Sequence, residues 1–331
     1  MSSEHMAEKW LVIVNPNAGR KRGEKDWSQI SGLLSLHDID YNVVFTERKR
    51  HAIELTQRAI NEGFRKIVAV GGDGTMNEVV NGVFLQETCP TNLITLGIIT
   101  VGTGNDWGRM FGIPGDYEGA VRLISDGVTC LSDAGVVEYN TDQGRDKRYF
   151  INIAGLGFDA LVVRRTNAQK EKGKNSKAIY FYNLLSSLLL YRHTHTDVVI
   201  DGRLITNQTF TISLGIGRYS GGGMRQTPNA IHDDGLFDIT IIKRMRKGEV
   251  IRSLKKLYDG TILDHPKTEG HIGRNIIINS QPAIHLEADG ESLGYSPIEF
   301  NIVPTAVNVI VNPASFSPEL LFETASASSY R

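Results

Sequence analysis

The sequence has only two cysteines in 331 residues, Cys89 and Cys130, and it has no Cys-x-x-Cys pair. This excludes a disulfide framework and a cysteine-ligated zinc site, and it is typical of a reducing compartment. The sequence also lacks a run of about 20 apolar residues, the length that a membrane-spanning helix needs. The polar amino terminus has no apolar signal segment. We therefore expect a cytoplasmic protein that is at most peripheral at a membrane surface.

An excess of charge of either sign is also missing. Lys and Arg number 36 and Asp and Glu number 37, so the net charge is −1 at pH 7. A surface built to hold nucleic acid would carry a strong positive balance. We therefore expect no nucleic-acid partner.

Two familiar nucleotide-binding signatures are absent as well. The chain has no GxxxxGK[ST] pattern, which excludes a P-loop enzyme, and it has no HRD and DFG pair, which excludes a protein kinase. The length of 331 residues fits two domains, and the hydrophobic content of 40% is ordinary for globular proteins.

The first third of the chain alternates short apolar runs with helix-compatible stretches. We predict strands at 10–14, 41–46, 66–70 and 93–100, and helices at 24–36, 51–62 and 75–84. This alternation predicts a doubly wound parallel sheet with helices on both faces. In such a sheet the ligand binds at the carboxyl ends of the strands.

Three glycine-rich or turn-forming loops follow predicted strands at this edge. They are Asn15-Pro16-Asn17-Ala18-Gly19, Gly71-Gly72-Asp73-Gly74-Thr75 and Gly102-Thr103-Gly104-Asn105-Asp106. Glycine lets a backbone come close to a ligand, and the N–H groups at a helix start attract anions. One such loop alone is more typical of a tight turn, but three at one sheet edge predict a phosphate site.

Asp73 and Glu78 each have two interpretations. A carboxylate among phosphate-binding amides is useful if Asp73 reaches Mg²⁺, which is usually held by one or two carboxylates and substrate phosphates. The alternative is that Asp73 caps the helix that follows. Thr75 to Glu78 has the T-x-x-E form of a capping box, which would start that helix at Thr75 and give Glu78 a structural role.

The residue pattern changes after Asp133. It contains short β-rich runs separated by turns, with helical segments at 177–191 and 247–258. This pattern predicts an antiparallel β-sandwich. We assign a nucleotide-binding α/β domain to 9–133 and a β-rich lipid-substrate domain to 134–304, and we leave open whether the segment 305–331 packs back on the first domain.

Several motifs, taken in order, resemble the catalytic-domain family of the diacylglycerol kinases, which includes bacterial lipid kinases and is related to sphingosine and ceramide kinases. The motifs are VNPNAG at 14–19, GGDGTMNE at 71–78, GTGND at 102–106, IAGLGFDA at 153–160, SGGGM at 220–224, DDGLF at 233–237 and DGE at 289–291. The GGDGT motif also occurs in NAD kinases. The sequence departs from the family at Arg218, where a Gly-Asn pair is common.

The resemblance implies roles for individual residues. ATP binding is assigned to the three loops and to positions beside them: Asn15, Pro16, Asn17, Gly19, Thr46, Gly71, Gly72, Gly74, Thr75, Asn77, Glu78, Thr103 and Asn105. Glu291 would be the general base for the lipid hydroxyl, with Asp73 as the second catalytic carboxylate. Asp234 and the carbonyls of Leu236 and Ile231 would hold a structural Mg²⁺. Asp106, Asp133 and Lys174 would form a charge network near the nucleotide.

The resulting prediction is an ATP- and Mg²⁺-dependent lipid kinase of phospholipid metabolism that contacts a membrane surface transiently. The acceptor stays open among diacylglycerol, sphingosine, ceramide, phosphatidylglycerol and undecaprenol, and the oligomeric state stays open with a homodimer as one option. An NAD kinase-like phosphotransferase and a non-catalytic nucleotide-binding regulator are the alternatives. Without the resemblance, the Asp289-Gly290-Glu291 segment would be interpreted as a hairpin turn.

Overall fold

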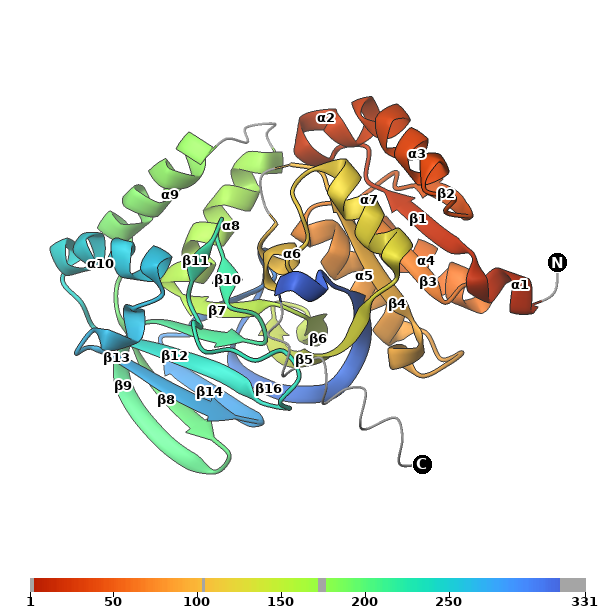
Figure 1. Cartoon of the computed structure of the whole chain (residues 1–331). Coiled ribbons are helices and arrows are strands. Elements are labelled where there is room, and N and C mark those ends of the chain that lie inside the picture. Colours follow the sequence, from red (N-terminus) through yellow and green to blue (C-terminus); the bar gives the residue numbers. More distant parts are fainter. Residues whose placement is uncertain (1–2, 103–104, 172–176, 316–331) are drawn as a thin grey trace. The chain divides into compact units, whose positions relative to one another are not determined.

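The computed structural model of the chain describes residues 3–102, 105–171 and 177–315 (Figure 1). It divides into two compact units. The first unit combines Met1–Ser132 with Thr305–Arg331, and the second unit is Asp133–Pro304. Each unit has its own core, and each is described by itself below.

The first unit is built on a sheet whose strands pair in parallel, in the order β16-β4-β3-β1-β2. Its strands are β1 (Trp10–Val14), β2 (Tyr41–Phe45), β3 (Lys66–Gly71), β4 (Thr95–Thr100) and the last residues of β16 (Glu291–Ile310). All five residues of β1 are buried. A strand that is apolar on both faces must be covered on both faces, and the helices of this unit provide that cover.

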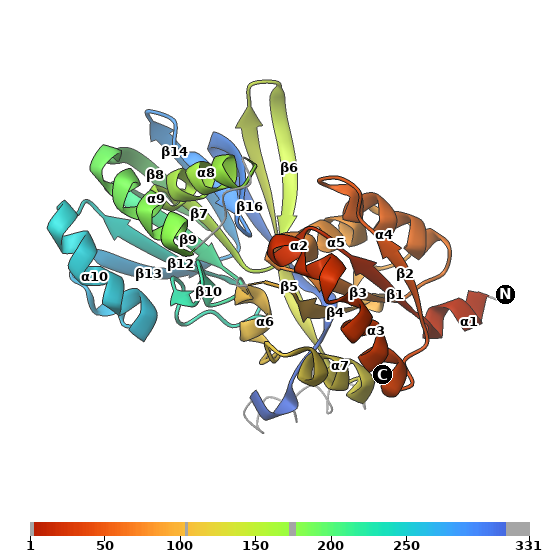
Figure 2. The same ribbon diagram turned by 90° about the horizontal axis from the view of Figure 1, so that it is seen from above.

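The helices of the first unit lie on two sides of β1, β3 and β4, with α3 and α7 on one side and α4 and α5 on the other (Figure 2). They are α1 (Ser3–Glu8), α2 (Ala18–Lys25), α3 (Trp27–Leu36), α4 (His51–Asn61), α5 (Asp73–Leu85), α6 (Asp106–Met110) and α7 (Tyr117–Asp126). Short 3-10 turns lie at Thr91–Leu93 and Pro313–Ser315. In α4 the buried side chains recur at helical spacing, which places one apolar stripe against the sheet.

The single helix predicted for 24–36 is wrong, because the chain forms two helices that meet at Asp26. The Asp26 carboxylate accepts hydrogen bonds from Arg22 Nε at 2.9 Å and from the hydroxyl of Tyr117 at 2.6 Å. These bonds hold the break against α7. Within α2, Gly19, Arg20 and Lys21 have φ values of 57°, 64° and 66°, which is the left-handed region.

The second unit is a set of antiparallel strands. They are β5 (Thr129–Thr141), β6 (Gly144–Phe150), β7 (Ile153–Gly157), β8 (Thr194–Ile200), β9 (Arg203–Gly215), β10 (Tyr219–Ser220), β11 (Met224–Arg225), β12 (Phe237–Lys243), β13 (Thr268–Gly273), β14 (Asn275–Gln281), β15 (His285–Ala288) and most of β16. Hydrogen-bonded pairing runs from β9 through β7, β15, β16, β14 and β8 back to β9. This closure encloses a core that includes Phe150, Phe237 and Phe300, whose rings contact one another.

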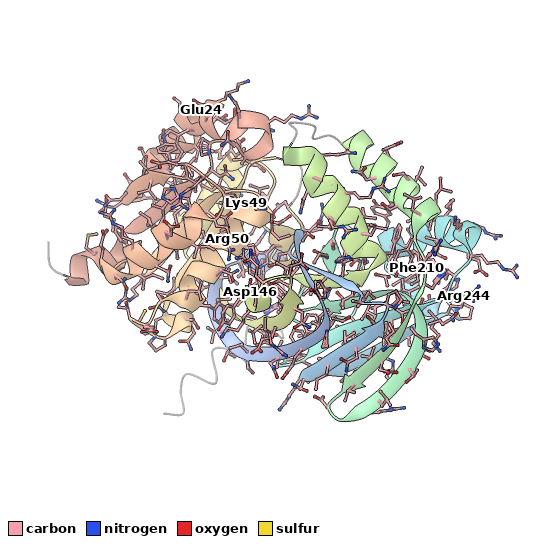
Figure 3. The ribbon with its side chains drawn as sticks, turned by 180° about the vertical axis from the view of Figure 1, so that it is seen from behind. Glu24, Lys49, Arg50, Asp146, Phe210 and Arg244 are labelled. Atoms are coloured by element: carbon pink, nitrogen blue, oxygen red, sulfur yellow. The ribbon has the colours of Figure 1, made fainter. Side chains whose placement is uncertain are left out.

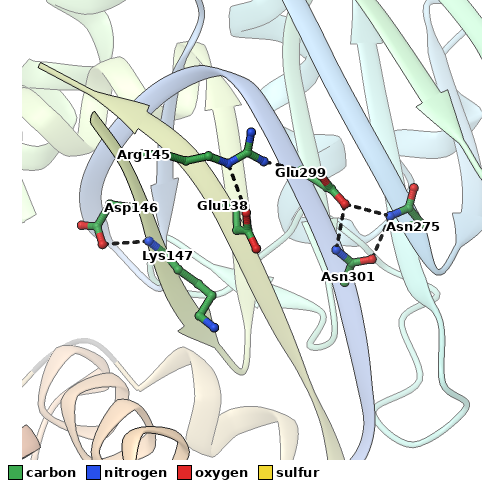
Figure 4. Close-up of polar contacts among 7 residues, drawn as sticks. All are labelled: Glu138, Arg145, Asp146, Lys147, Asn275, Glu299 and Asn301. Carbon is green, nitrogen blue, oxygen red and sulfur yellow. Dashed lines mark hydrogen bonds and ion pairs between the residues drawn. The ribbon is translucent and has the colours of Figure 1, made fainter. Parts of the chain in front are cut away.

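Strand β6 pairs with β5 as a long hairpin (Figure 2). Arg145 of β6 forms ion pairs with Glu138 of β5 and Glu299 of β16 (Figure 4). Glu299 also accepts hydrogen bonds from Asn275 and Asn301. These polar contacts tie the exposed face of the hairpin to the rest of the sheet.

Three helices cover one part of this unit: α8 (Phe158–Glu171), α9 (Lys177–Leu190) and α10 (Lys247–Asp259). A short 3-10 turn, Ile262–Asp264, follows α10. A second apolar cluster lies here, with Phe158, Leu184, Phe210 and Val250 among its members (Figure 3 labels Phe210). The sequence predicted α9 and α10 but missed α8. No helix in the described parts of the chain is both long enough and apolar enough to cross a membrane.

Candidate active site

The ends of β1, β3 and β4 lie next to one another, because β3 pairs with both of the other strands. Backbone hydrogen bonds continue this contact into the loops. The N–H of Asn15 donates to the carbonyl of Val70 at 2.9 Å, and the N–H of Val101 donates to Gly71 at 2.8 Å. The N–H of Thr46 donates to Val14 at 2.9 Å. The three predicted loops and Thr46 therefore meet at one edge of the sheet.

Side chains join the first loop to the second. Asn15 Nδ2 donates to Thr75 Oγ1 at 3.0 Å, and the N–H of Asn17 donates to Asn15 Oδ1 at 3.1 Å. A Cβ atom on Gly71 would collide with the Thr75 hydroxyl. Gly71 is therefore required by local packing, in addition to any role toward a ligand.

The first loop also meets the third loop, backbone against backbone. A Cβ atom on Gly19 would lie 3.1 Å from both N and Cα of Gly102, and both glycines have positive φ. Side chains at these two positions would separate the loops and would require a left-handed backbone that L-residues rarely adopt.

The N-terminus of α5 follows β3 at this edge and has no side-chain cap. Gly72 is the N-cap, its backbone is extended at φ −107°, and it offers no side chain to satisfy the first-turn amides. The first N–H groups of a helix have no partner within the helix and attract anions. This geometry fits a phosphate group.

Asp73 is the first residue of α5 and its carboxylate reaches another helix. Its two oxygens accept hydrogen bonds from the N–H groups of Asp106 and Trp107, each at 3.2 Å. The alternative that Asp73 caps its own helix is wrong, because the cap position belongs to Gly72. Asp73 instead caps α6 and fixes the third loop to the second.

The capping box predicted at Thr75 is also wrong, because α5 begins two residues earlier. Thr75 accepts its hydrogen bond from Asn15. Glu78 accepts from the N–H groups of Arg50 at 2.9 Å and Ala52 at 3.2 Å. Glu78 therefore caps the N-terminus of α4, where Arg50 (labelled in Figure 3) has a left-handed φ of 64°.

Asn105 and Asn77 are buried polar groups beside the loops. Asn105 is the N-cap of α6, and its Oδ1 is buried and accepts no hydrogen bond from any residue that the structure describes. A buried acceptor without a partner is costly, so this oxygen is suited to accept a hydrogen bond from a ligand. Asn77 accepts from Asn81 Nδ2 through both its backbone carbonyl and its Oδ1. Thr103 lies outside the described residues.

The residues predicted to form a charge network lie in different units of the chain. Asp106 is buried in α6 of the first unit, and Asp133 is fully buried in the second unit. Asp133 Oδ2 accepts from the N–H of Gly235 at 2.7 Å, and its own N–H donates to the carbonyl of His232 at 2.7 Å. Lys174 lies outside the described residues. Within its unit, Asp133 holds the loop that contains Asp234.

The predicted structural metal ligands lie in that loop. Asp234 Oδ1 accepts from the N–H of Leu236 at 3.0 Å, and burial raises the pKa of Asp234. The side chain of Ile231 is exposed. Nowhere in the described residues do three or more His, Cys, Asp or Glu side chains gather in a way that could hold a metal ion.

Glu291 is the first residue of β16 and follows a two-residue turn. Asp289 and Gly290 have φ values of 48° and 78°, and Ala288 pairs with Glu291 across the turn. Positive φ at both central residues is the pattern of a type I′ hairpin turn. The Asp289 carboxylate accepts from the N–H groups of Ile151, Asn152 and Ile153 at 3.0–3.3 Å. The segment is therefore a hairpin turn, and the hydrogen bonds of Asp289 fix the backbone position of this turn and of Glu291 after it.

Two carboxylates beneath this turn were not predicted. Glu287 is buried and its Oε2 accepts from the N–H of Gly290 at 2.9 Å. Burial and the nearby Asp159 raise the pKa of Glu287 well above its usual range. Burial also raises the pKa of Asp159 to about 6, although Thr211 and Ser213 donate to it. For Glu287 the only signal in the sequence was a Glu between apolar residues of a short strand, whereas Asp159 lies in the IAGLGFDA motif but was given no role.

Comparison with known families gives two consecutive matches. Residues 9–137 match the model of the diacylglycerol kinase catalytic domain. Residues 152–311 match the YegS C-terminal NAD kinase beta sandwich-like domain. The first part of the chain is therefore similar to the diacylglycerol kinase catalytic domain, and the second part is similar to the YegS C-terminal domain. The resemblance seen in the sequence and the prediction of a mixed α/β fold with a C-terminal β-sandwich are thereby confirmed.

Individual relatives agree with this assignment. A diacylglycerol kinase of Staphylococcus haemolyticus is 28% identical over 309 residues, which cover 93% of this chain and 90% of that protein. A Bacillus anthracis protein described as a candidate diacylglycerol kinase has a TM-score of 0.76 and 25% identity, covering 93% of this chain and 97% of that one. These members of a diacylglycerol kinase family support a kinase.

The fold alone is also shared with yeast NADH kinase solved with NADH. That structure has a TM-score of 0.50 and 12% identity, covering 92% of this chain and 83% of the other.

Proposed function

We propose that this protein is an ATP- and Mg²⁺-dependent lipid kinase that transfers the γ-phosphate to a lipid hydroxyl such as that of diacylglycerol. The observation that carries the proposal is the match to the diacylglycerol kinase catalytic domain, which includes all three loops at the edge of the parallel sheet. The Staphylococcus haemolyticus relative is named a diacylglycerol kinase, and the match covers 90% of its length.

The nucleotide is assigned to the first unit. The N-terminus of α5, which has no side-chain cap, and the glycines of the three loops are suited to phosphate groups. The buried Oδ1 of Asn105 is suited to a donor on the nucleotide. Asp73 is the residue that would hold Mg²⁺, directly or through water. When bound, Mg²⁺ neutralises charge that develops on the transferred phosphoryl group.

Glu291 is assigned the role of general base. The lipid hydroxyl oxygen forms a bond to the γ-phosphorus, the bond from that phosphorus to the β,γ-bridging oxygen breaks, and ADP leaves. The hydroxyl proton passes to the Glu291 carboxylate. Little covalent chemistry is required of the protein, because phosphoryl transfer depends mainly on positioning and charge stabilisation. Asp289 contributes by fixing the turn from which Glu291 projects.

An NAD kinase-like reaction is the second candidate, because the fold is shared with yeast NADH kinase. The two reactions differ in the acceptor hydroxyl, which is on a ribose in one case and on a lipid in the other. We expect purified protein with ATP labelled at the γ-phosphate to label diacylglycerol in mixed micelles and not NAD. Label on NAD alone would overturn the lipid proposal, and label on neither, with ATP still bound, would indicate a non-catalytic nucleotide-binding regulator.

A membrane surface is the partner that a lipid kinase must contact. In the second unit, α9 ends in the exposed Leu189 and Leu190, and Lys247 at the start of α10 donates to the Leu189 carbonyl at 2.7 Å. Ile251 of α10 is also exposed. The same helix and the residue before it carry Arg246, Lys247, Arg252, Lys255 and Lys256. Apolar side chains beside cations favour an anionic bilayer surface.

Vesicle sedimentation tests this contact. We expect wild-type protein to bind phosphatidylglycerol vesicles more strongly than phosphatidylcholine vesicles, and Leu189→Ser with Leu190→Ser to lose most of that binding. The matched control is Leu204→Ser with Ile272→Ser, which removes two side chains of similar exposure elsewhere in the unit. Equal binding by both double variants would refute the assignment of this surface.

A further inference from the structure

A row of three residues crosses neighbouring strands of the second unit close to the turn that precedes Glu291. Strand β7 lies between β15 and β9, and Gly155 of β7 stands opposite Glu287 on one side and Ser213 on the other. Residues directly opposite each other in antiparallel strands project from the same face of the sheet. Because Gly155 has no side chain, this face has room for another group between Glu287 and Ser213.

Asp159 of α8 occupies that room. Its Oδ2 accepts hydrogen bonds from the hydroxyls of Thr211 at 2.9 Å and Ser213 at 3.5 Å. A Cβ atom on Gly155 would lie 2.7 Å from Glu287 Oε1 and 3.1 Å from Asp159 Cβ. The two acidic residues therefore approach the same point above Gly155, and a larger residue at that position would displace them.

The surroundings of this carboxyl pair supply no positive charge. The groups around it are hydroxyls, an amide, a phenol and two further acids: Thr211, Ser213, Gln226, Tyr191, Asp289 and Glu291. Within the described residues, no Lys, Arg or His forms an ion pair with either member of the pair. Arg164 of α8 contacts His285 Nε2 instead, at 2.9 Å. Two neighbouring carboxylates that are buried without a cation cannot both be ionised at low cost.

The pKa values of the pair agree with its geometry. Burial raises the pKa of Asp159 to about 6, and burial together with the charge of Asp159 raises the pKa of Glu287 well above its usual range. Interacting carboxyl groups titrate as a pair. The pair therefore keeps a proton near neutral pH.

The carboxyl pair is attached to the turn that carries Glu291. Glu287 Oε2 accepts from the N–H of Gly290 at 2.9 Å. Asn167, which lies on the same helix as Asp159, donates to the carbonyl of Gly290 at 3.0 Å. Both backbone groups of the residue before Glu291 are thus held by the elements that carry the pair.

We propose that Glu287 and Asp159 are positioning residues for Glu291, and that their two carboxyl groups share one proton and together hold the turn from which Glu291 acts. Neither residue touches the substrate, since both act through the backbone of the turn. Loss of the shared proton would place two like charges against each other next to this turn. The inference rests on the proposed role of Glu291 as general base.

Steady-state kinetics test the positioning role. Glu287→Ala removes the acceptor for the N–H of Gly290, so we expect kcat for diacylglycerol phosphorylation to fall about 10-fold or more, because a displaced base reacts poorly. The KM for ATP should be unchanged, since the nucleotide loops belong to the first unit. Glu287→Gln keeps a carbonyl oxygen for this N–H and should restore most of the lost kcat. Glu299→Ala is the matched control, because it removes another hydrogen-bonded carboxylate of the second unit and should keep the wild-type kcat.

The melting temperature at two pH values tests the shared proton. A carboxyl group whose pKa is raised by folding binds more protons in the folded state, so stability falls as the pH rises from the ordinary carboxyl range through the raised values. Glu287→Gln and Asp159→Asn each remove one of the two charges. We expect each variant to melt close to the wild type at about pH 5 and about 2–4 °C above it at about pH 9.

The double variant of Glu287→Gln with Asp159→Asn shows whether the two groups act as a pair. The repulsion between them can be removed only once, so at the higher pH the double variant should gain less than the sum of the two single gains. Glu299→Gln is the control for this series and should show no gain over the wild type at either pH.

Two results would overturn the proposal. One is a kcat of Glu287→Ala equal to that of Glu299→Ala, and the other is a gain at the higher pH that is absent or strictly additive. If Glu287→Ala does not fold, Gly155→Ala displaces the same carboxylate and should lower kcat at an unchanged KM for ATP. Wild-type protein that binds ATP but labels no lipid would overturn the proposed function and the positioning role with it, and the melting series would then decide the shared proton by itself.

Discussion

At the scale of single residues, carboxylates that accept backbone N–H bonds organise both units. Asp73 holds α6, Asp133 holds the loop that contains Asp234, and Asp289 holds the segment 151–153. Each places a carboxylate against one or more N–H groups that are far away in the sequence. Such charge-assisted hydrogen bonds are roughly twice as strong as neutral ones, which makes these residues good targets for substitution.

Glu291→Gln tests the general base. The amide cannot accept the hydroxyl proton, so we expect lipid phosphorylation to fall by about 10²–10⁴-fold. ATP affinity measured by calorimetry should be unchanged, because the substitution leaves the first unit intact. Glu299→Gln on the same strand is the control and should keep its activity. Transfer at the wild-type rate in Glu291→Gln would disprove the assigned role.

Asp73→Asn separates the structural role of this carboxylate from its proposed metal role. Asn has one acceptor oxygen, so one of the N–H groups of α6 loses its partner, and we expect a melting temperature about 2–4 °C lower. Loss of the charge needed by Mg²⁺ should reduce turnover at saturating ATP by more than ~10-fold.

Asp116→Asn is the control for this variant, since Asp116 caps α7 through one bond to the N–H of Gly119 at 2.8 Å. Asn and Asp are nearly equal as N-caps, so neither stability nor turnover should change. If Asp73→Asn kept full turnover and lost only stability, the metal role would be ruled out and the cap of α6 would be its sole function.

At the scale of elements, the N-terminus of α4 is capped by a side chain of α5. Glu78 of α5 accepts from two N–H groups at the start of α4. This contact orients the segment after β2, which contains Thr46 and the basic residues Arg48, Lys49 and Arg50. The position of that segment beside the first loop thus depends on packing between two helices.

Glu78→Ala should therefore destabilise the first unit by about 1 kcal/mol, the usual cost of losing an N-cap. In a chain of this size we expect a melting temperature about 2–4 °C lower. Glu54→Ala is the control, because Glu54 lies on α4 but only forms an exposed ion pair with Arg48, and such pairs contribute little. Equal effects of the two substitutions would contradict the capping role.

At the scale of the whole molecule, the division into two units separates the proposed tasks. The three loops of the nucleotide site belong to the first unit, and Glu291, the Asp234 loop and the exposed leucines belong to the second. The strand β16 contributes to both units, because its first residues pair with β15 in the second unit and its last residues pair with β4 in the first.

Hydrogen exchange on the full chain tests this division. A non-hydrolysable ATP analogue with Mg²⁺ should slow exchange in peptides that contain residues 15–19, 71–75 and 101–106, because the first-turn amides of α5 and the loop amides gain acceptors. Peptides from α10 and β13 should be unaffected and serve as the internal control. Unchanged exchange at 71–75 in the presence of saturating analogue would refute the assignment of this loop to phosphate.

The sequence alone was sufficient to locate the loops of the candidate site. A short buried strand and the turn that ends it are determined by residues next to one another in the sequence. The ends of β1 and β3 could therefore be predicted closely. Motif order and spacing then indicated the similarity to the diacylglycerol kinase catalytic domain, which the comparison confirms. The glycines at 71 and 72 were also recognisable, because a backbone that must come close to its surroundings leaves a local signal.

Only the tertiary structure decided which group each polar side chain binds. Asp73 caps α6, Glu78 caps α4, and Glu287 lies buried near Asp159. The sequence pattern had suggested local caps for the first two and gave almost no sign of the third. The physical reason is that a carboxylate binds whichever N–H group folding brings within about 3 Å. For Asp73 and Glu78 those donors lie more than 20 residues away in the sequence, so their identity depends on how the elements pack.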